Sequence, residues 1–224
     1  MTHKNCAMPG YQVKYETHML GDSHFEIRSL LDRQQFADPD GTALALGISS
    51  ASWPLFGMVW PSARMLANAM QTQDLAGKRI LEIGCGLALA SLVIHRRQGD
   101  ITATDCHPLT ETFLLENVRI NALPHLKYQT GHWGRPNPAL GQFDLIIASD
   151  VLYERDQPET LSQFIHCHSS SQVNIIVLDP DRGNRNDFCR RMGALGFALN
   201  LQRAGTTQCT GEAYKGHFLN FKWA

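Results

Sequence analysis

The sequence lacks features that mark whole classes of proteins. Its 224 residues carry a formal net charge of only −1, whereas proteins that grip nucleic-acid phosphates are usually clearly basic. Its longest apolar runs, such as 87–94, fall far short of the roughly 20 residues that span a bilayer. Residues 1–10 have no apolar core of the kind a secretory signal needs. We therefore expect no nucleic-acid partner, no membrane segment and no secretory signal.

Cysteine is scarce and shows no paired spacing. The six cysteines are scattered, which suits a reducing cytoplasm better than a disulfide framework. Residues 166–168 read His-Cys-His, but neighbouring residues on a helix point in different directions and rarely share an ion, so we expect no metal site. The composition is that of a globular protein, with 43% hydrophobic and 18% charged residues. A soluble, cytoplasmic protein is predicted; its oligomeric state is left open, and a monomer is compatible with the sequence.

The first quarter of the chain has a pattern of its own. Apolar residues alternate with polar ones over 11–15 and again around Phe25 and Ile27, and Gly-Asp at 21–22 is a turn signal, so a short hairpin is predicted. Residues 38–47 are rich in turn-forming and small residues and are expected to form a loop. This segment holds too few apolar residues for its own core. We expect residues 1–56 to be an extension packed on a domain formed by 57–224.

Strands and helices are expected to alternate from Trp60 to the end of the chain. Apolar runs at 79–83, 143–149 and 173–178 predict strands buried on both faces, and helical spacing of apolar residues separates them. Repeated strand–helix units predict a doubly wound α/β fold, with a mostly parallel sheet and helices on both faces. Ligands of such sheets bind at the carboxyl ends of the strands.

A glycine turn follows the first of these strands. Gly84 and Gly86 allow the backbone to turn sharply and approach a ligand, and the next helix offers free N–H groups. A dinucleotide fingerprint needs a small residue where Leu89 stands, which disfavours a nicotinamide enzyme. The next strand ends at Asp105, roughly twenty residues on, where an acid can bind two ribose hydroxyls. Taken alone, Asp105 could equally be the N-cap of a helix.

These segments together resemble the class I, S-adenosylmethionine-dependent methyltransferases. The glycine turn lies in ILEIGCGLALASL at 80–92, and the acid lies in ATD at 103–105. Three further segments narrow the resemblance to the family-16 (D-x-x-Y) methyltransferases, which include many protein-lysine methyltransferases. They are GMVWPSA at 57–63, WG at 133–134 and SDVLYE at 149–154. The resemblance covers 57–181 and implies a seven-stranded, Rossmann-like sheet.

The resemblance also implies a role for ten residues. Eight would surround S-adenosylmethionine: Trp60 at its border, Glu82 toward the methionine amino group, Gly84, Cys85 and Gly86 through backbone atoms, Asp105 on the ribose, Trp133 on the adenine and Ser149 beneath the cofactor. Two would line the substrate side, Asp150 and Tyr153. Asp150 could orient the acceptor or act as a general base. Without the surrounding motifs, Asp150 would read as an N-cap and Tyr153 as a packing residue.

The methyl acceptor is left open by the residues. The leading hypothesis is a lysine side chain of a protein, and the alternatives are a small-molecule amine or a non-catalytic module that binds S-adenosylmethionine. Residues 179–183 could rim the substrate pocket or form a solvated loop. The apolar cluster at 53–56 could form a lid, or pack the N-terminal segment onto the domain.

Overall fold

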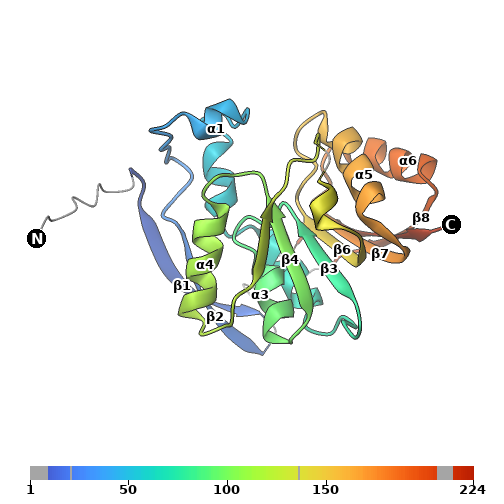
Figure 1. Cartoon of the computed structure of the whole chain (residues 1–224), viewed down its shortest axis with the longest axis horizontal. Coiled ribbons are helices and arrows are strands. Elements are labelled where there is room, and N and C mark those ends of the chain that lie inside the picture. Colours follow the sequence, from blue (N-terminus) through green and yellow to red (C-terminus); the bar gives the residue numbers. More distant parts are fainter. Residues whose placement is uncertain (1–9, 21, 136, 206–213) are drawn as a thin grey trace, which may run out of the picture.

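The central sheet has seven strands in the order β5-β4-β3-β6-β7-β9-β8. The computed structural model describes residues 10–20, 22–135, 137–205 and 214–224 (Figure 1). Strands β3 to β7 run parallel, and β9 pairs antiparallel with both β7 and β8. The strands are β3 Arg79–Ile83, β4 Asp100–Asp105, β5 Lys127–Thr130, β6 Phe143–Ser149, β7 Ser169–Asp179, β8 Phe197–Arg203 and β9 His217–Trp223. This confirms the predicted doubly wound, mostly parallel seven-stranded sheet.

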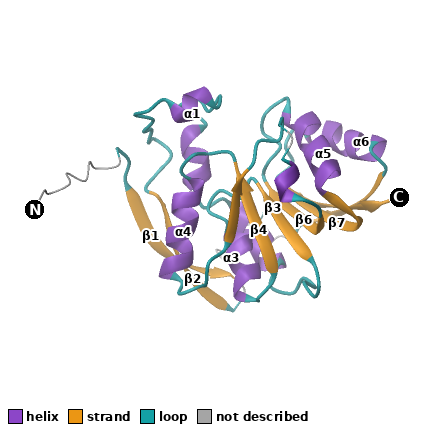
Figure 2. Cartoon of the chain, in the orientation of Figure 1, coloured by secondary structure: helices purple, strands orange, loops and turns teal. Residues whose placement is uncertain are grey.

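Helices cover both faces of this sheet, because successive strand residues point to opposite sides. On β6, Leu145 and Ile147 join the core beneath α2, α3 and α4, whereas Ile146 and Ala148 join the core beneath α5 and α6 (Figure 2). The helices are α1 Thr42–Ala45, α2 Pro61–Ala69, α3 Leu89–Arg96, α4 Thr110–Ile120, α5 Gln157–His168 and α6 Arg185–Ala194, with 3₁₀ turns η1 at Trp53–Gly57 and η2 at Pro138–Leu140. The continuous apolar run of β6 therefore fills both cores.

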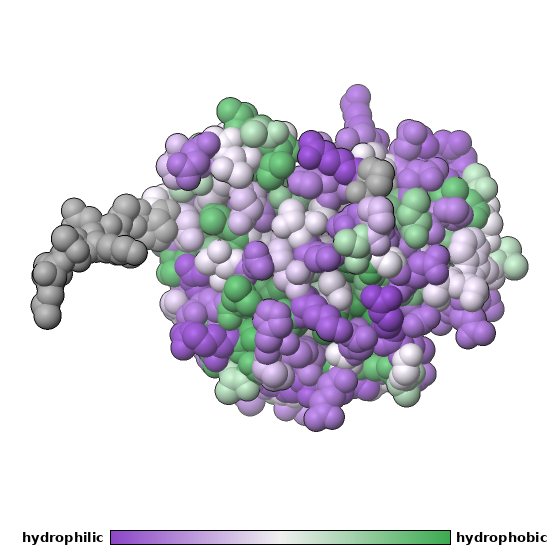
Figure 3. Space-filling model, viewed as in Figure 1, coloured by the Kyte–Doolittle hydropathy of each residue, from purple (hydrophilic) through white to green (hydrophobic). Residues whose placement is uncertain are grey.

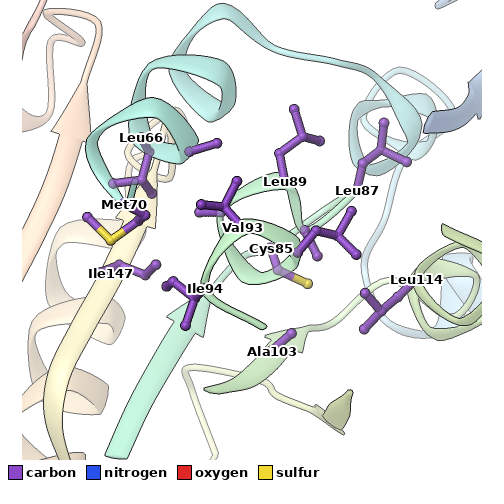
Figure 4. Packing of buried hydrophobic residues seen from close by; sticks show 14 of the residues in the cluster. Leu66, Met70, Cys85, Leu87, Leu89, Val93, Ile94, Ala103, Leu114 and Ile147 are labelled. Carbon is purple, nitrogen blue, oxygen red and sulfur yellow. The ribbon is translucent and has the colours of Figure 1, made fainter. Parts of the chain in front are cut away.

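The core on the first face holds the glycine turn in place. Figure 4 shows Leu66 of α2 and Met70, which follows that helix, packed with Val93 and Ile94 of α3, beside Ile147 of β6. Four of these five side chains have no exposed surface and the fifth, that of Val93, is 1% exposed. Burying such a side chain contributes roughly 1.5–3 kcal/mol each. The turn between β3 and α3 is therefore anchored by packing on both of its flanks.

The predicted hairpin is present as β1 Val13–Leu20 and β2 Ser23–Leu30, paired antiparallel. Gly21 of the predicted turn lies outside the described residues. The outer edge of β2 faces α4, and the amide of Asn121, which caps the C-terminus of this helix, accepts from the Glu26 N–H at 3.0 Å and donates to the Glu26 carbonyl at 2.7 Å. The Asn117 amide likewise accepts from the Arg28 N–H at 2.8 Å. Figure 1 shows the hairpin beside α4, at the opposite end of the molecule from α6.

One prediction in the N-terminal segment was incomplete. The expected loop over 38–47 contains the single helical turn α1. The Asp38 carboxylate accepts hydrogen bonds from the N–H groups of Ala43 and Leu44, both at 2.9 Å, and so satisfies donors that a helix start leaves free. The small residues of this segment thus form a helical turn because the Asp38 carboxylate caps its N-terminus.

The surface is mixed in polarity. On the face shown in Figure 3, hydrophobic residues are scattered among hydrophilic ones. No helix in the described ranges is long and apolar enough to cross a membrane.

Candidate active site

The turn after β3 uses left-handed backbone at three positions. Gly84 has φ +61°, Gly86 has φ +51° and Ala88 has φ +58°. A Cβ on Gly84 would come within 2.8 Å of the Val151 side chain, and one on Gly86 within 2.9 Å of the Phe56 carbonyl oxygen. Both glycines are therefore required by conformation and by space. Ala88 adopts a conformation that favours glycine and precedes the first residue of α3.

Asp105 ties the second strand to this turn. Its carboxylate accepts from the Gly86 N–H at 2.9 Å and from the His107 N–H at 2.9 Å. Burial raises the pKa of Asp105, and these backbone donors oppose that shift. Each oxygen retains a lone pair for a further donor, such as a ribose hydroxyl. The turn and the acid that the sequence pointed to are thus in direct contact.

Glu82 is buried beneath the same turn. One of its carboxylate oxygens accepts from the Ser91 N–H at 2.8 Å and also from the Ser91 hydroxyl. Burial raises the pKa of Glu82 to about 7. The carboxylate therefore joins β3 to the first turn of α3, where a helix favours negative charge.

Of three other predicted cofactor residues, Trp133 is the one that the structure shows against this turn. Trp133 packs within 3.4 Å of the position that a Cβ on Gly84 would occupy. Ser149 ends β6, beside Leu178 of β7. Trp60 immediately precedes α2, and its indole N–H donates to the Leu55 carbonyl at 2.8 Å. Cys85 is buried, and burial raises the pKa of its thiol well above the usual value; its backbone N–H donates to the Thr104 carbonyl at 3.0 Å.

Asp150 follows β6 in a left-handed conformation, with φ +55°. Such backbone is uncommon outside glycine, although aspartate tolerates it better than most residues, and it is concentrated at functional sites. The carboxylate forms a bidentate ion pair with Arg182, with Nε–Oδ1 at 2.8 Å and Nη2–Oδ2 at 3.0 Å. The Asp150 N–H donates to the Leu178 carbonyl at 2.9 Å.

Tyr153 lies in the same loop and is 45% exposed, an unusual setting for an aromatic side chain. Partial burial raises the pKa of Tyr153 to about 12, so the hydroxyl stays protonated near neutral pH. The loop is held from the β7–α6 side by Asn184, whose amide donates to the carbonyls of Leu152 at 3.0 Å and Glu154 at 2.8 Å. The Asp150–Tyr153 segment is therefore fixed by residues about thirty positions later.

The segment after β7 contacts the Asp150–Tyr153 loop through Arg182 and Asn184, and the two readings of residues 179–183 both stay predictions. Asp179 is 1% exposed; its Oδ1 accepts from the Arg182 N–H at 2.9 Å, and its Oδ2 is buried without a hydrogen-bond partner. Burial raises the pKa of Asp179 to about 6. The sequence analysis did not single out Arg182 or Asn184 individually, and their only signal was the Asp-Pro-Asp-Arg-Gly segment at a strand end.

The 53–56 cluster covers the cofactor side. Phe56 stacks on His107 with ring centroids 3.8 Å apart and an interplanar angle of 13°, and Trp53 meets the same imidazole edge-on. Burial lowers the pKa of His107 to about 4, so the ring is neutral. Because the Phe56 carbonyl also overlies Gly86, this segment packs the N-terminal extension onto the glycine turn.

The sheet order and the glycine turn define a class I methyltransferase fold. A solved magnesium protoporphyrin IX methyltransferase from Synechocystis PCC 6803, determined with bound S-adenosylmethionine, superposes with a TM-score of 0.54 at 15% identity, covering 73% of this chain and 76% of that one.

The sequence comparisons narrow the class to a family. The family described as lysine methyltransferase matches residues 50–193, and the chain belongs to it. Among curated relatives, protein N-lysine methyltransferase METTL21A of Xenopus tropicalis is 29% identical over 56% of this chain and 62% of its own length. Human histone-arginine methyltransferase METTL23 is 30% identical over 52% of this chain and 66% of its own length. The matches thus span less than two thirds of either relative.

Proposed function

We propose that this protein is an S-adenosylmethionine-dependent N-methyltransferase whose acceptor is a lysine side chain of a protein. The observation that carries the proposal is the Asp150–Tyr153 loop, which lies against the glycine turn through Val151 and Gly84. This contact brings an acid and an exposed tyrosine beside the turn that the family uses for its cofactor. Membership of the lysine methyltransferase family supports the choice of acceptor.

The residues present fit the cofactor. Gly84 and Gly86 leave a surface free of side chains, and the Asp105 carboxylate has lone pairs for ribose hydroxyls. Trp133 would contact the adenine, Glu82 the methionine amino group, Ser149 the underside and Trp60 the border. When bound, S-adenosylmethionine supplies a methyl group that is activated by its attachment to a sulfonium.

The contribution of the protein to such a transfer is positioning. Holding a nucleophile in line with the methyl carbon can supply about 7–11 kcal/mol. An acceptor lysine must also lose its proton, and with a free pKa near 10.4 that costs roughly 4.6 kcal/mol at pH 7. An apolar slot beside Trp60 and Tyr153 would favour the neutral amine by excluding water. Asp150 and the Tyr153 hydroxyl would orient that amine through hydrogen bonds.

We also propose a cytoplasmic location. The four cysteines in the described ranges, Cys85, Cys106, Cys167 and Cys189, are all unpaired, which suits a reducing compartment.

The proposal is tested by incubating the protein with methyl-labelled S-adenosylmethionine and a cell lysate, then separating the label by size and locating it by mass spectrometry. A discrete labelled polypeptide carrying methyl-lysine is expected, and Asp150→Ala and Asp150→Asn should abolish or strongly reduce it. Label on arginine, or only in small molecules, would overturn the choice of acceptor. Cofactor binding without label in any fraction would favour a non-catalytic module.

A further inference from the structure

The Arg182 guanidinium is paired with the carboxylate of Asp150, the acid that the proposed function places on the acceptor side. Both carboxylate oxygens are engaged, at 2.8 and 3.0 Å. The carboxylate is the inner partner, with 12% of its side chain exposed, and the guanidinium is the outer one, with 41% exposed. Such planar, bidentate geometry matches the two flat groups and is more specific than an ordinary surface contact.

The backbone holds Arg182 in this position. The Asp179 carboxylate accepts from the Arg182 N–H, and the Asp150 N–H donates to the Leu178 carbonyl, so both partners are fixed to the end of β7. Asn184 binds two carbonyls of the Asp150–Tyr153 loop from the same segment. The two loops that carry Asp150 and Arg182 are therefore both tied by hydrogen bonds to the end of β7.

The other charged groups nearby have different partners. Asp181 pairs with Arg185 of α6 and with His217 of β9. Ionisable groups from every adjoining element lie nearby: Tyr153 in the Asp150 loop, Asp179 at the end of β7, Asp181 after β7, Arg185 on α6, Tyr214 before β9 and His217 on β9. The Asp150 hydrogen bonds raise the pKa of Arg182, so this guanidinium remains charged.

We propose that Arg182 is a positioning residue that keeps Asp150 neutralised, so that the acceptor lysine reacts as a neutral amine. This inference rests on the proposed function. A bare carboxylate beside the acceptor would stabilise its ammonium form, whereas a carboxylate that already holds a guanidinium can orient the amine without favouring its protonation. The amine lone pair then forms the N–C bond as the C–S bond breaks with its electrons going to sulfur, and the methylated ammonium loses its proton to solvent.

The test compares pH profiles of kcat for the wild type and Arg182→Gln, with the unmethylated form of the polypeptide identified in the lysate as acceptor. The profile of kcat reports groups in the complex. In Arg182→Gln the exposed carboxylate should shift the acid-side midpoint upward by about one pH unit or more, with about tenfold slower turnover near neutral pH and recovery at high pH. Arg182→Lys keeps the positive charge and should keep the midpoint.

Arg185→Gln is the matched control, because it removes a neighbouring guanidinium that pairs with Asp181 and leaves Asp150 untouched. Its midpoint should equal that of the wild type. Asp150→Asn is the second variant: its unpaired Arg182 should disfavour the ammonium and lower the midpoint of whatever activity remains. Cofactor binding and thermal unfolding of each variant identify any that fail to fold.

A loss of activity in Arg182→Gln that is equal at every pH would overturn the inference and leave Arg182 as a structural loop residue. An unchanged profile would overturn it as well, and so would a raised midpoint in Asp150→Asn. If the wild type labels lysine, these outcomes concern the inference alone. If the wild type labels no lysine, the proposed function fails and the inference fails with it.

Discussion

The carboxyl edge of the sheet can be divided into two halves whose acidic residues have different partners. The cofactor half is the glycine turn with Glu82 and Asp105, and the acceptor half is the Asp150–Tyr153 loop with residues 179–184. In the cofactor half, Glu82 and Asp105 are buried, take part in none of the ion pairs found among the described residues, and bind backbone N–H groups or a serine. In the acceptor half, Asp150 and Asp181 are each paired with an arginine. Glu82 and Asp105 in the cofactor half are satisfied by neutral donors, whereas Asp150 and Asp181 in the acceptor half are paired with cations and the buried Asp179 beside them accepts from a backbone N–H.

This difference fits what each half would bind. Buried acids held by neutral donors keep their acceptor capacity for hydroxyl and amino groups of a ligand. Acids that are already paired with arginine offer less attraction to an incoming cation. Under the proposed function, acidic residues would recognise the cofactor on one side and orient the acceptor on the other.

The largest effect is expected for Asp105→Ala in the cofactor half, and it is a loss of affinity for S-adenosylmethionine. The change removes the carboxylate that would accept from two ribose hydroxyls, and hydrogen bonds to a charged acceptor contribute about 1.5–3 kcal/mol each, so S-adenosylmethionine should bind at least about 100-fold more weakly by calorimetry. Asp100→Ala, on the same strand but paired with Lys127 at the surface, is the control and should bind normally. Equal affinities for both variants would contradict the role of Asp105.

The cost of a buried acid without a cation is tested by Glu82→Gln. The pKa of Glu82 is raised in the folded state, so its contribution to stability is complete below the unfolded value of 4.5 and is lost as pH rises toward about 7. Over that range the free energy of unfolding of the wild type should fall by about 3 kcal/mol, and that of Glu82→Gln should not show this fall. Urea unfolding at pH 5 and pH 8 measures this, and parallel changes in the two proteins would show that Glu82 does not titrate as expected.

Tyr153→Phe tests the acceptor half, because it removes only a hydroxyl group. Turnover should fall about tenfold, as expected when an orienting hydrogen bond of about 1.4 kcal/mol is lost, while cofactor affinity is unchanged. Tyr15→Phe is the control, since Tyr15 is 55% exposed on the hairpin. A weaker cofactor affinity in Tyr153→Phe would mean that the two halves are not separable at this residue.

The smallest effect is expected for Asn184→Ala, which removes two hydrogen bonds that hold the Asp150–Tyr153 loop. A net loss of roughly 1 kcal/mol should lower kcat about fivefold without changing cofactor affinity. Asn186→Ala, at an exposed position on α6, is the matched control. If both variants behave like the wild type, the loop keeps its conformation without this clamp.

The cofactor half was largely predictable because its signals are local. The glycine turn, the strands on either side of it and Asp105 lie within about twenty-five residues, and hydrophobic patterning locates each element. The hairpin was also predicted correctly, from alternation around a turn signal. What the sequence could not show is that Glu82 bonds Ser91, because nothing in a serine nine residues away distinguishes it from any other helical serine.

The acceptor half was less predictable because its contacts are distant in sequence. Asp150 and Arg182 are 32 positions apart and meet only because β6 and β7 are neighbours that end together. A strand-end aspartate gives no indication of which of several arginines it will pair with. The left-handed conformation of Asp150 is also set by its surroundings, since aspartate accepts several backbone conformations.

The asparagines of α4 have a consequence for how this molecule behaves at high concentration. An open strand edge invites pairing with another chain and hence aggregation. Here the amides of Asn117 and Asn121 occupy the hydrogen-bonding groups of β2 as a neighbouring strand would. A two-stranded ribbon can therefore stand apart from the main sheet, and one side of it is closed to intermolecular association by a helix.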